Sequence, residues 1–439
     1  NNVFKGAEIL TLGVRGNIGS SASKYRSNQN TFFDILEYGA DVKLSIPRFL
    51  FFTNTDKIIP RRMFPVTTMS LGYFNQQNIG LDKENLTGIF NYNWSPQRRT
   101  SFTFDVVNLQ FVRNMNPGNY FNVYKSSYNS LNNIASASNI NGNYYDQSGN
   151  LTIAEGGADA FIGDVLSGNT TINPNSSEFK TVRSISERKN RLSENNLILA
   201  SNLTFTQSSR FNLDDNEFYT FKTKLESAGN LMSLIAKSQN NNVREDGSKT
   251  FFDVAYSQYI KGEIDYVKYF ALSGKQVFAF RAFGGIAIPY GNSKNIPFSR
   301  SYFAGGSNDN RAWQSYRLGP GRSGGVNDFN EANMKLAFSA EYRFNLTGKW
   351  NAALFADAGN IWNTLDNVED ASMVFSGINS LKDIALGTGA GIRYDFSFFV
   401  IRCDLGFKTY NPAKPDGEKW FKELNFSKMV LNVGINYPF

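Results

Sequence analysis

Residues 333–344 read NMKLAFSAEYRF and alternate between polar and apolar side chains with a period of two. One face of an extended strand would carry the apolar residues Met334, Leu336, Phe338, Ala340, Tyr342 and Phe344. The opposite face would carry Asn333, Lys335, Ser339, Glu341 and Arg343. Residues 37–47 and 429–439 alternate in the same way, and each of the three runs has 11 or 12 residues. At about 3.4 Å per residue, a tilted strand of this length crosses a bilayer.

The alternation predicts a transmembrane β-barrel rather than a soluble β protein. Strands of soluble proteins average about 5–6 residues, which is half the length seen here. The continuous polar face requires water, while the aromatic-rich apolar face requires lipid or a second sheet. The composition agrees, with 39 Phe and 21 Tyr but only 19% charged residues, and no apolar run approaches the roughly 20 residues of a membrane helix. A closed barrel satisfies every backbone group in lipid.

The same reading along the chain gives an all-β fold of about fourteen antiparallel strands. We place them near residues 4–19, 37–47, 65–75, 85–95, 100–113, 195–207, 216–228, 257–271, 275–289, 331–346, 350–361, 384–396, 398–409 and 426–439. Short turns alternate with long connections, as in outer-membrane barrels whose long loops face outward. The longest connection, 114–194, is rich in Asn, Ser and Gly, so we expect an extracellular loop that forms a mobile cap or small hairpins. Residues 231–237 are apolar enough for a short helix.

The composition also excludes several classes of function. The chain has no histidine and a single cysteine, Cys403, so imidazole catalysis, internal disulfides and cysteine metal clusters are excluded. No motif indicates a catalytic, cofactor-binding or metal site. The net charge of +7 is spread along the chain and predicts no nucleic-acid partner. We therefore expect neither an enzyme nor a cofactor.

The stretch 289–330 carries the most informative motif. It contains Phe303-Ala304-Gly305-Gly306, then Asn310-Arg311-Ala312-Trp313, then Leu318-Gly319-Pro320-Gly321. This order resembles the sixth extracellular loop of the BamA/TamA family of outer-membrane assembly factors. In that family an aromatic residue and Gly-Gly precede an Arg-centred turn, commonly Val-Arg-Gly-Phe/Tyr, and Leu-Gly-Pro follows. This chain departs at the turn, where Asn310 and Ala312 replace the aliphatic residue and the glycine.

Three further segments match the family in order. Residues 354–362 (LFADAGNIW) are similar to the family's Phe-x-Asp-x-Gly strand, and 387–395 with 401–406 are similar to its penultimate pair of strands. The chain ends in an aromatic residue, Phe439, as the family's assembly signal does. Details at 289–291, 297–298 and 437–439 look most like TamL, the TamA-like lipoprotein branch.

The resemblance assigns roles to residues of the loop. In the family, the sixth loop folds into the barrel lumen and its Arg pairs with acidic residues of the inner wall. Arg311 matches that Arg, Asp357 matches the acid of Phe-x-Asp-x-Gly, and Glu341 lies where a second acid occurs. Alternation independently points Asp357 and Glu341 inward, opposite the lipid-facing positions of their strands. The motif as a whole comprises Phe303, Gly305, Gly306, Arg311, Trp313 and Gly319.

The resemblance further implies sixteen strands, with the first two and the periplasmic POTRA repeats expected upstream of this chain. We then expect residues 4–19 and 426–439 to leave an open seam, weakened by Gly434 and Pro438, beside Tyr437 and Phe439. The implied function is assembly or translocation at the outer membrane of a diderm bacterium. The expected partners are outer-membrane lipid, client outer-membrane proteins, and accessory envelope subunits or an inner-membrane protein. The alternatives are a secretion pore for a partner protein and a passive or selective porin.

Overall fold

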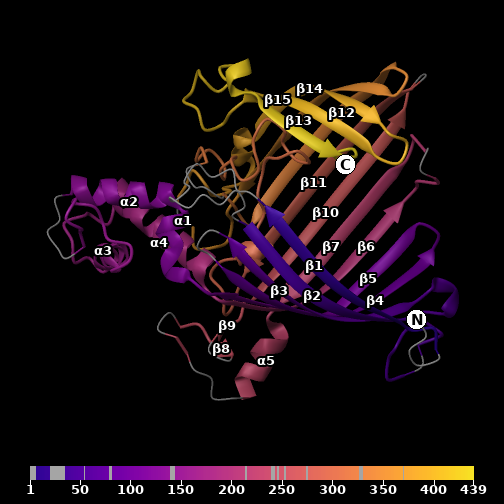
Figure 1. Ribbon diagram of the computed structural model, residues 1–439, viewed down its shortest axis with the longest axis horizontal. Helices are drawn as coiled ribbons and strands as arrows, with labels where there is room; N and C mark the ends of the chain where they lie inside the picture. Colours follow the sequence, from indigo (N-terminus) through magenta and orange to yellow (C-terminus); the bar gives the residue numbers. More distant parts are fainter. Residues whose placement is uncertain are drawn as a thin grey trace.

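The computed structural model describes residues 6–19, 35–53, 55–78, 82–138, 144–212, 215–238, 243–244, 247–251, 254–272, 275–325, 330–368 and 370–439. Fourteen strands form one antiparallel sheet in which each strand pairs with the next along the chain (Figure 1). They are β1 (Ile9–Gly19), β2 (Ile35–Ile46), β3 (Val66–Asn78), β4 (Lys83–Gln97), β5 (Thr100–Asn114), β6 (Asn196–Ser208), β7 (Tyr219–Ala228), β10 (Tyr259–Ala271), β11 (Gln276–Pro289), β12 (Met334–Thr347), β13 (Trp350–Trp362), β14 (Ala385–Asp395), β15 (Val400–Tyr410) and β16 (Val430–Ile435). The predicted number and order of the strands are confirmed.

The two faces of the sheet separate as the alternation predicts. On β13, Leu354 is 55% exposed while its neighbours Ala353 and Phe355 are buried. Other outward apolar side chains are exposed on strand after strand: Leu12, Val14, Tyr38, Val42, Leu71, Ile264, Phe338, Ile392, Ile401, Leu431, Val433 and Ile435. The curved sheet therefore presents an apolar surface to lipid and turns its polar residues inward. This is the architecture of a membrane-spanning β-barrel wall. None of the described helices is long and apolar enough to cross a membrane.

The long connections lie at one end of the strands, on the left in Figure 1, and we assign this end to the outside of the cell. The connection between β7 and β10 contains α5 (Asn230–Ser238), at the position predicted for a short helix, and the hairpin β8 (Thr250–Phe251) and β9 (Val254–Ala255). Short 3₁₀ helices lie at η1 (Arg61–Met63), η2 (Pro117–Asn119), η3 (Phe298–Arg300), η4 (Ile378–Asp383) and η5 (Phe426–Lys428). The connections at the opposite end are short, except for the connection 47–65, which contains η1.

The connection between β5 and β6 differs from the expected mobile cap or set of hairpins. It folds into α1 (Tyr120–Val123), α2 (Lys125–Ala137), α3 (Gly157–Leu166) and α4 (Ser177–Ser193), which project beyond the strands (Figure 1). Its few apolar residues recur at helical spacing, as in Val182, Ile185 and Leu192 of α4, and they close a buried core. The Ser176 hydroxyl caps α4 by accepting a hydrogen bond from the Phe179 amide at 3.1 Å. This connection is therefore a helical subdomain beyond the end of the barrel that carries the long connections.

The last strand is shorter than the predicted 426–439. β16 holds only six residues, because η5 precedes it and Asn436 adopts a left-handed backbone with φ of 64° directly after it. A strand cannot continue through that conformation. Tyr437, Pro438 and Phe439 therefore leave the sheet.

The connection between β15 and β16 is held by the carboxylate of Glu423. It accepts hydrogen bonds from Asn411 Nδ2 at 2.6 Å and from Lys428 Nζ at 3.0 Å. Burial disfavours the charged carboxylate, but these donors outweigh burial and lower the pKa of Glu423 from 4.5 to about 2. A lowered folded-state pKa stabilises the fold above the unfolded value and is lost as the pH falls. The connection should therefore loosen between pH 4.5 and about 2.

Trp420 lies in this connection and reports on it. We expect its fluorescence, isolated by subtracting a Trp420→Phe variant, to change across that acidic range. Glu423→Gln should remove the transition, because glutamine does not titrate. A transition of unchanged midpoint in Glu423→Gln would assign it to another group.

Candidate functional site

The connection between β11 and β12, residues 290–333, returns into the hollow of the barrel and presents Arg311. Gly305 and Gly306 have φ values of 90° and 106°, a region that side chains rarely adopt. A Cβ on Gly305 would lie 2.4 Å from the carbonyl oxygen of Gln314, so only glycine fits. The Gly306 amide donates to the Trp313 carbonyl at 2.8 Å, and the Gly305 amide donates to Asp309 Oδ2 at 2.7 Å. These bonds close a compact turn with Arg311 near its tip.

Arg311 is bound to Asp357 of β13 by three hydrogen bonds. Its Nε donates to Oδ2 at 2.8 Å and its Nη2 donates to Oδ1 at 3.0 Å, which is the bidentate geometry of a strong guanidinium–carboxylate pair. The Arg311 amide also donates to Oδ2, at 3.1 Å. Both side chains are 1% exposed. The loop tip is therefore tied to the wall by its backbone as well as by its side chain.

Two more acids and one ring complete the surroundings of Arg311. Its Nη1 donates to Glu341 Oε2 of β12 at 2.5 Å and lies 3.5 Å from Asp404 Oδ2 of β15. The ring of Phe355 lies under the guanidinium, with 3.5 Å between Cζ and the ring centroid. A cation over an aromatic face is attracted most strongly where water is excluded. The structure thus places Arg311 within ion-pair distance of both predicted acids and of Asp404. These three acids lie on three different strands.

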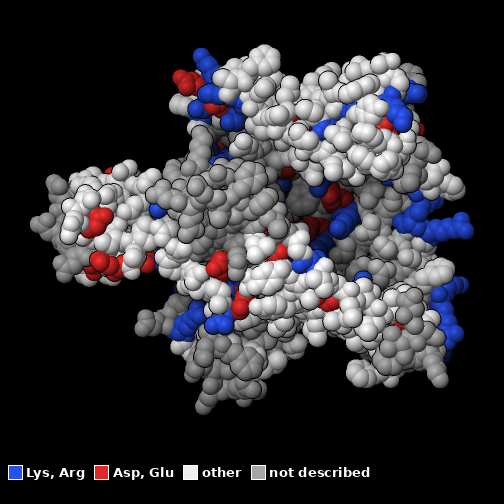
Figure 2. Space-filling view, viewed as in Figure 1, with Lys and Arg blue, Asp and Glu red and all other residues white. Residues whose placement is uncertain are grey.

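Three arginines of the wall extend this arrangement into a buried network. Glu341 Oε1 accepts from Arg343 Nε at 2.7 Å and lies 3.1 Å from Arg393 Nη2. Asp404 lies 2.8 Å from Arg393 Nη1 and 2.6 Å from Arg402 Nη1. These wall residues lie on β12, β14 and β15, and each is at most 8% exposed. Figure 2 shows acidic and basic side chains inside the hollow of this face.

Small residues on the wall allow the loop backbone to approach it. A Cβ on Gly406 of β15 would lie 2.2 Å from the Arg311 carbonyl oxygen, and one on Gly387 of β14 would lie 2.5 Å from Ala312 Cβ. The departure from the family pattern at Ala312 is therefore accommodated by Gly387. The Arg311 carbonyl also accepts from Asn432 Nδ2 of β16 at 2.9 Å. The loop tip thereby reaches the last strand.

The other predicted motif residues pack the loop itself. Trp313 is buried and lies under Lys408, whose Nζ is 5.5 Å from its ring. Phe303 stacks on Tyr316 of the same loop, with ring centroids 4.2 Å apart. Gly319 faces Gly325, because a Cβ there would lie 2.3 Å from the Gly325 amide. These residues shape the loop that delivers Arg311.

Both ends of the loop are anchored by residues that sequence reasoning missed. Near its start, the Tyr302 hydroxyl donates to Glu263 Oε1 of β10 at 3.0 Å, and Lys261 Nζ donates to the Arg300 carbonyl at 2.9 Å. Near its end, the buried Glu331 binds Arg188 at 3.1 Å and Arg191 at 2.7 Å, both on α4. The loop therefore connects the wall with the helical subdomain.

The edges of the sheet are β1 and β16, and no backbone ladder joins them in the part of the chain that the structure describes. The molecule is hollowed between them in Figure 2. Gly434 of β16 packs on the Arg402 guanidinium, since a Cβ there would lie 2.8 Å from its Nε. The open seam between these two strands stays a prediction.

The terminal residues do not extend this edge, contrary to the prediction that they belong to the last strand. Arg343 lies over the Tyr437 ring at 4.1 Å and near the Phe439 ring at 5.6 Å. The Tyr269 hydroxyl of β10 donates to the main-chain oxygen of Phe439. Pro438 is buried beside them. The chain end is therefore held against the wall of the hollow by side chains of β10 and β12.

Comparison with known proteins places these features in a family context. The model of the Omp85 superfamily domain matches residues 7–428. An 88-residue segment is 36% identical to outer membrane protein assembly factor BamA of Neisseria meningitidis serogroup B, and it spans 18% of this chain but only 11% of that protein. BamA from Haemophilus ducreyi lacking POTRA domains 1–3 aligns with 98% of this chain and 69% of its own, at a TM-score of 0.50 and 10% identity. CdiB from Acinetobacter baumannii aligns with 97% of this chain and 65% of its own, at 10% identity and a TM-score of 0.32, too low to indicate a shared arrangement.

Proposed function

The chain belongs to the Omp85 superfamily. We propose that it inserts client β-barrel proteins into the outer membrane or moves proteins across it. Insertion would proceed by addition of a client strand to β16. The observation that carries this proposal is the edge of β16. This strand ends the sheet and pairs with β15 through only six residue pairs, so a ladder on its other side is short as well. An unpaired edge is a template for another strand, and backbone groups left unpaired in lipid cost several kcal/mol each. A client strand satisfies these groups as it enters the membrane.

The properties of β16 suit transient pairing. It has six residues, far fewer than the 13 of β13, so a strand bound to it forms few hydrogen bonds and can leave again. Leu431, Val433 and Ile435 face outward from it, so an added strand continues the lipid-facing surface. The chain turns inward at Asn436, so residues 437–439 do not lie along the edge of β16. The energy for insertion comes from client folding.

The filled lumen favours assembly over passive conduction. The loop 290–333 lies in the hollow and is fixed by a buried ion-pair network, whereas a porin needs an open aqueous channel. We further propose that the protein is not an enzyme, and that its partners are client barrels and accessory envelope subunits. Membership of the TamL branch stays a prediction.

Site-directed cross-linking to a stalled client tests the proposal. The native thiol is first removed with Cys403→Ser, because Cys403 is exposed. Val433→Cys should then form disulfides with cysteines in the terminal strand of a client, in a pattern that shifts by two residues when Leu431→Cys is used. The matched control is Leu354→Cys, which is equally exposed to lipid but lies within the paired sheet.

The outcome discriminates between the candidate functions. Client disulfides at residues 431 and 433 but not at 354 support strand addition. Client disulfides at Lys335→Cys, on the inner face, support a secretion pore that passes its partner through the lumen. Equal disulfide formation at 354 and 433 would contradict both.

A further inference from the structure

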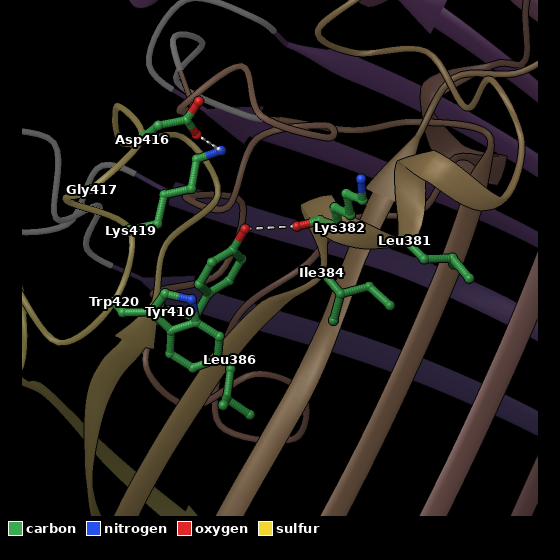
Figure 3. A pocket seen from close by; sticks show the side chains of 9 residues that line it. All are labelled: Leu381, Lys382, Ile384, Leu386, Tyr410, Asp416, Gly417, Lys419 and Trp420. Carbon is green, nitrogen blue, oxygen red and sulfur yellow. Dashed lines mark hydrogen bonds and ion pairs between the residues drawn. The ribbon is translucent and has the colours of Figure 1, made fainter.

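A pocket of about 570 Å³ lies at the extracellular end of β14 and β15, apart from the network around Arg311. Its walls come from the connection between β13 and β14 and from the connection between β15 and β16 (Figure 3). The lining is mostly apolar and includes Leu381, Ile384, Leu386, Tyr410 and Trp420. The Tyr410 and Trp420 rings lie 4.6 Å apart, and the Tyr410 hydroxyl donates to the Lys382 carbonyl at 2.8 Å. The pocket is thus built from two loops that meet on adjacent strands.

The register of the strands shows that this pocket opens on the lipid side of the barrel. Gly387 of β14 points inward toward the lumen loop, and a register shift between Leu386 and Gly387 places Leu386 beside Tyr410 rather than Thr409. Leu386 therefore shares the outward face of β14 with Ile392, which is 50% exposed. The pocket continues the lipid-facing surface at its outer rim.

Large apolar side chains of the same connection are exposed beside the pocket. Trp420, Phe421 and Phe426 are 54%, 60% and 77% exposed. Phe426 packs edge-on against Phe407, with 5.6 Å between centroids, and Phe407 pairs with the outward Thr388. Aromatic residues at this height are typical of the interface between hydrocarbon and head groups. The exposed patch has the composition of an aromatic belt at a membrane interface.

Two lysines lie on the solvent side of the rings. Figure 3 places the ammonium groups of Lys382 and Lys419 on one side of Tyr410 and Trp420, and Leu386 on the other. Lys419 is held by Asp416 at 2.8 Å, and Asp416 is 96% exposed, so a ligand can displace this acid into water. Two lysines beside an apolar pocket are complementary to a ligand that has an anionic head group and a hydrocarbon tail.

We propose that this pocket binds an acylated, phosphorylated lipid of the outer leaflet. An acyl chain lies along Leu386 and Trp420, while a phosphate of the head group accepts hydrogen bonds from Lys382 and Lys419. Because β14 lies two strands from the edge strand β16, the bound lipid would fix the membrane boundary beside the seam.

Native mass spectrometry of the purified protein in detergent tests the proposal, with bisphosphorylated lipid A as the probe. The double variant Lys382→Ala/Lys419→Ala should bind the probe about tenfold more weakly, because charge-assisted hydrogen bonds are lost. The control is Lys275→Ala/Lys349→Ala, which removes two exposed lysines at the opposite end. Fully dephosphorylated lipid A should bind the wild type as weakly as the phosphorylated form binds the double variant.

Photocross-linking identifies the occupant in cells. With p-benzoylphenylalanine in place of Trp420, we expect an adduct with the mass of a phosphorylated glycolipid. An adduct with a polypeptide would overturn the proposal in favour of protein docking. Unchanged affinity of the double variant, or equal binding of the dephosphorylated probe, would overturn it as well. Binding is measured without a client, so its failure would leave the strand-addition proposal intact.

Discussion

Replacing Arg311 with alanine is expected to destabilise the barrel by about 3–5 kcal/mol, because the change leaves a buried carboxylate without its partner. Asp357 is 1% exposed, and Arg311 is its sole ion-pair partner within the described ranges. Glu341 and Asp404 keep Arg343, Arg393 and Arg402, so the loss concentrates at Asp357. The urea midpoint of the protein in phosphatidylcholine vesicles, followed by heat-modifiable gel mobility, measures the effect.

A double-mutant cycle separates the ion pair from the loss of packing. Asp357→Asn removes the stranded charge, so Arg311→Ala/Asp357→Asn should lose clearly less than the sum of the two single variants. Arg15→Ala is the matched control, since Arg15 pairs with Asp41 at 2.9 Å but is 66% exposed, and such pairs contribute about 0–1 kcal/mol. Additive losses in the cycle would show that Arg311 acts through packing on Phe355 rather than through charge.

Replacing Leu354 with arginine is expected to cost about 2–4 kcal/mol, because the charge enters the hydrocarbon layer. Leu354 lies inside β13, is 55% exposed, and has the outward residues Tyr342 and Ala390 as cross-strand neighbours. The side chain at this position therefore lies on the outward, apolar face of the sheet. Folding yield into vesicles, measured as the fraction of heat-modifiable protein across a urea series, gives the cost.

Leu346→Arg is the control for depth. Leu346 is 53% exposed, almost the same as Leu354, but it adjoins the tight turn between β12 and β13. At the interface an arginine costs only about 0–1 kcal/mol. Equal losses at both positions would mean that Leu354 does not face hydrocarbon.

The period-two pattern was sufficient to predict the strands because each strand is wet on one face and in lipid on the other. It failed at the last strand, where Asn436 turns the chain inward. No alternation reveals that turn, since Tyr437 and Phe439 continue the pattern in sequence while packing against Arg343 in space. The helices α1–α4 escaped prediction because their polar faces dominate the composition of the segment.

Only the motif residues of the candidate site could be predicted from the sequence; the surrounding network of wall residues could not. Arg311, Asp357 and Glu341 followed from the resemblance of the loop and strand motifs to the BamA/TamA family, and the inward parity of the two acids supported the assignment. The same parity marks Arg402 and Asp404 as inward on β15, between the outward Ile401, Cys403 and Leu405. Their convergence with Arg393 depends on the curvature and register of three strands, which no single segment encodes.

The position of α1–α4 outside the barrel constrains the protein's own biogenesis. With the long connections assigned to the outside of the cell, we expect every residue between β5 and β6 to cross the membrane before the core around Leu131, Phe161 and Val182 closes. We expect the segment to cross unfolded, and its folding on the outer side would prevent its return. The pairing of Glu331 with Arg188 and Arg191 can form only after that folding. We therefore expect the lumen loop to gain its anchor on α4 late in folding.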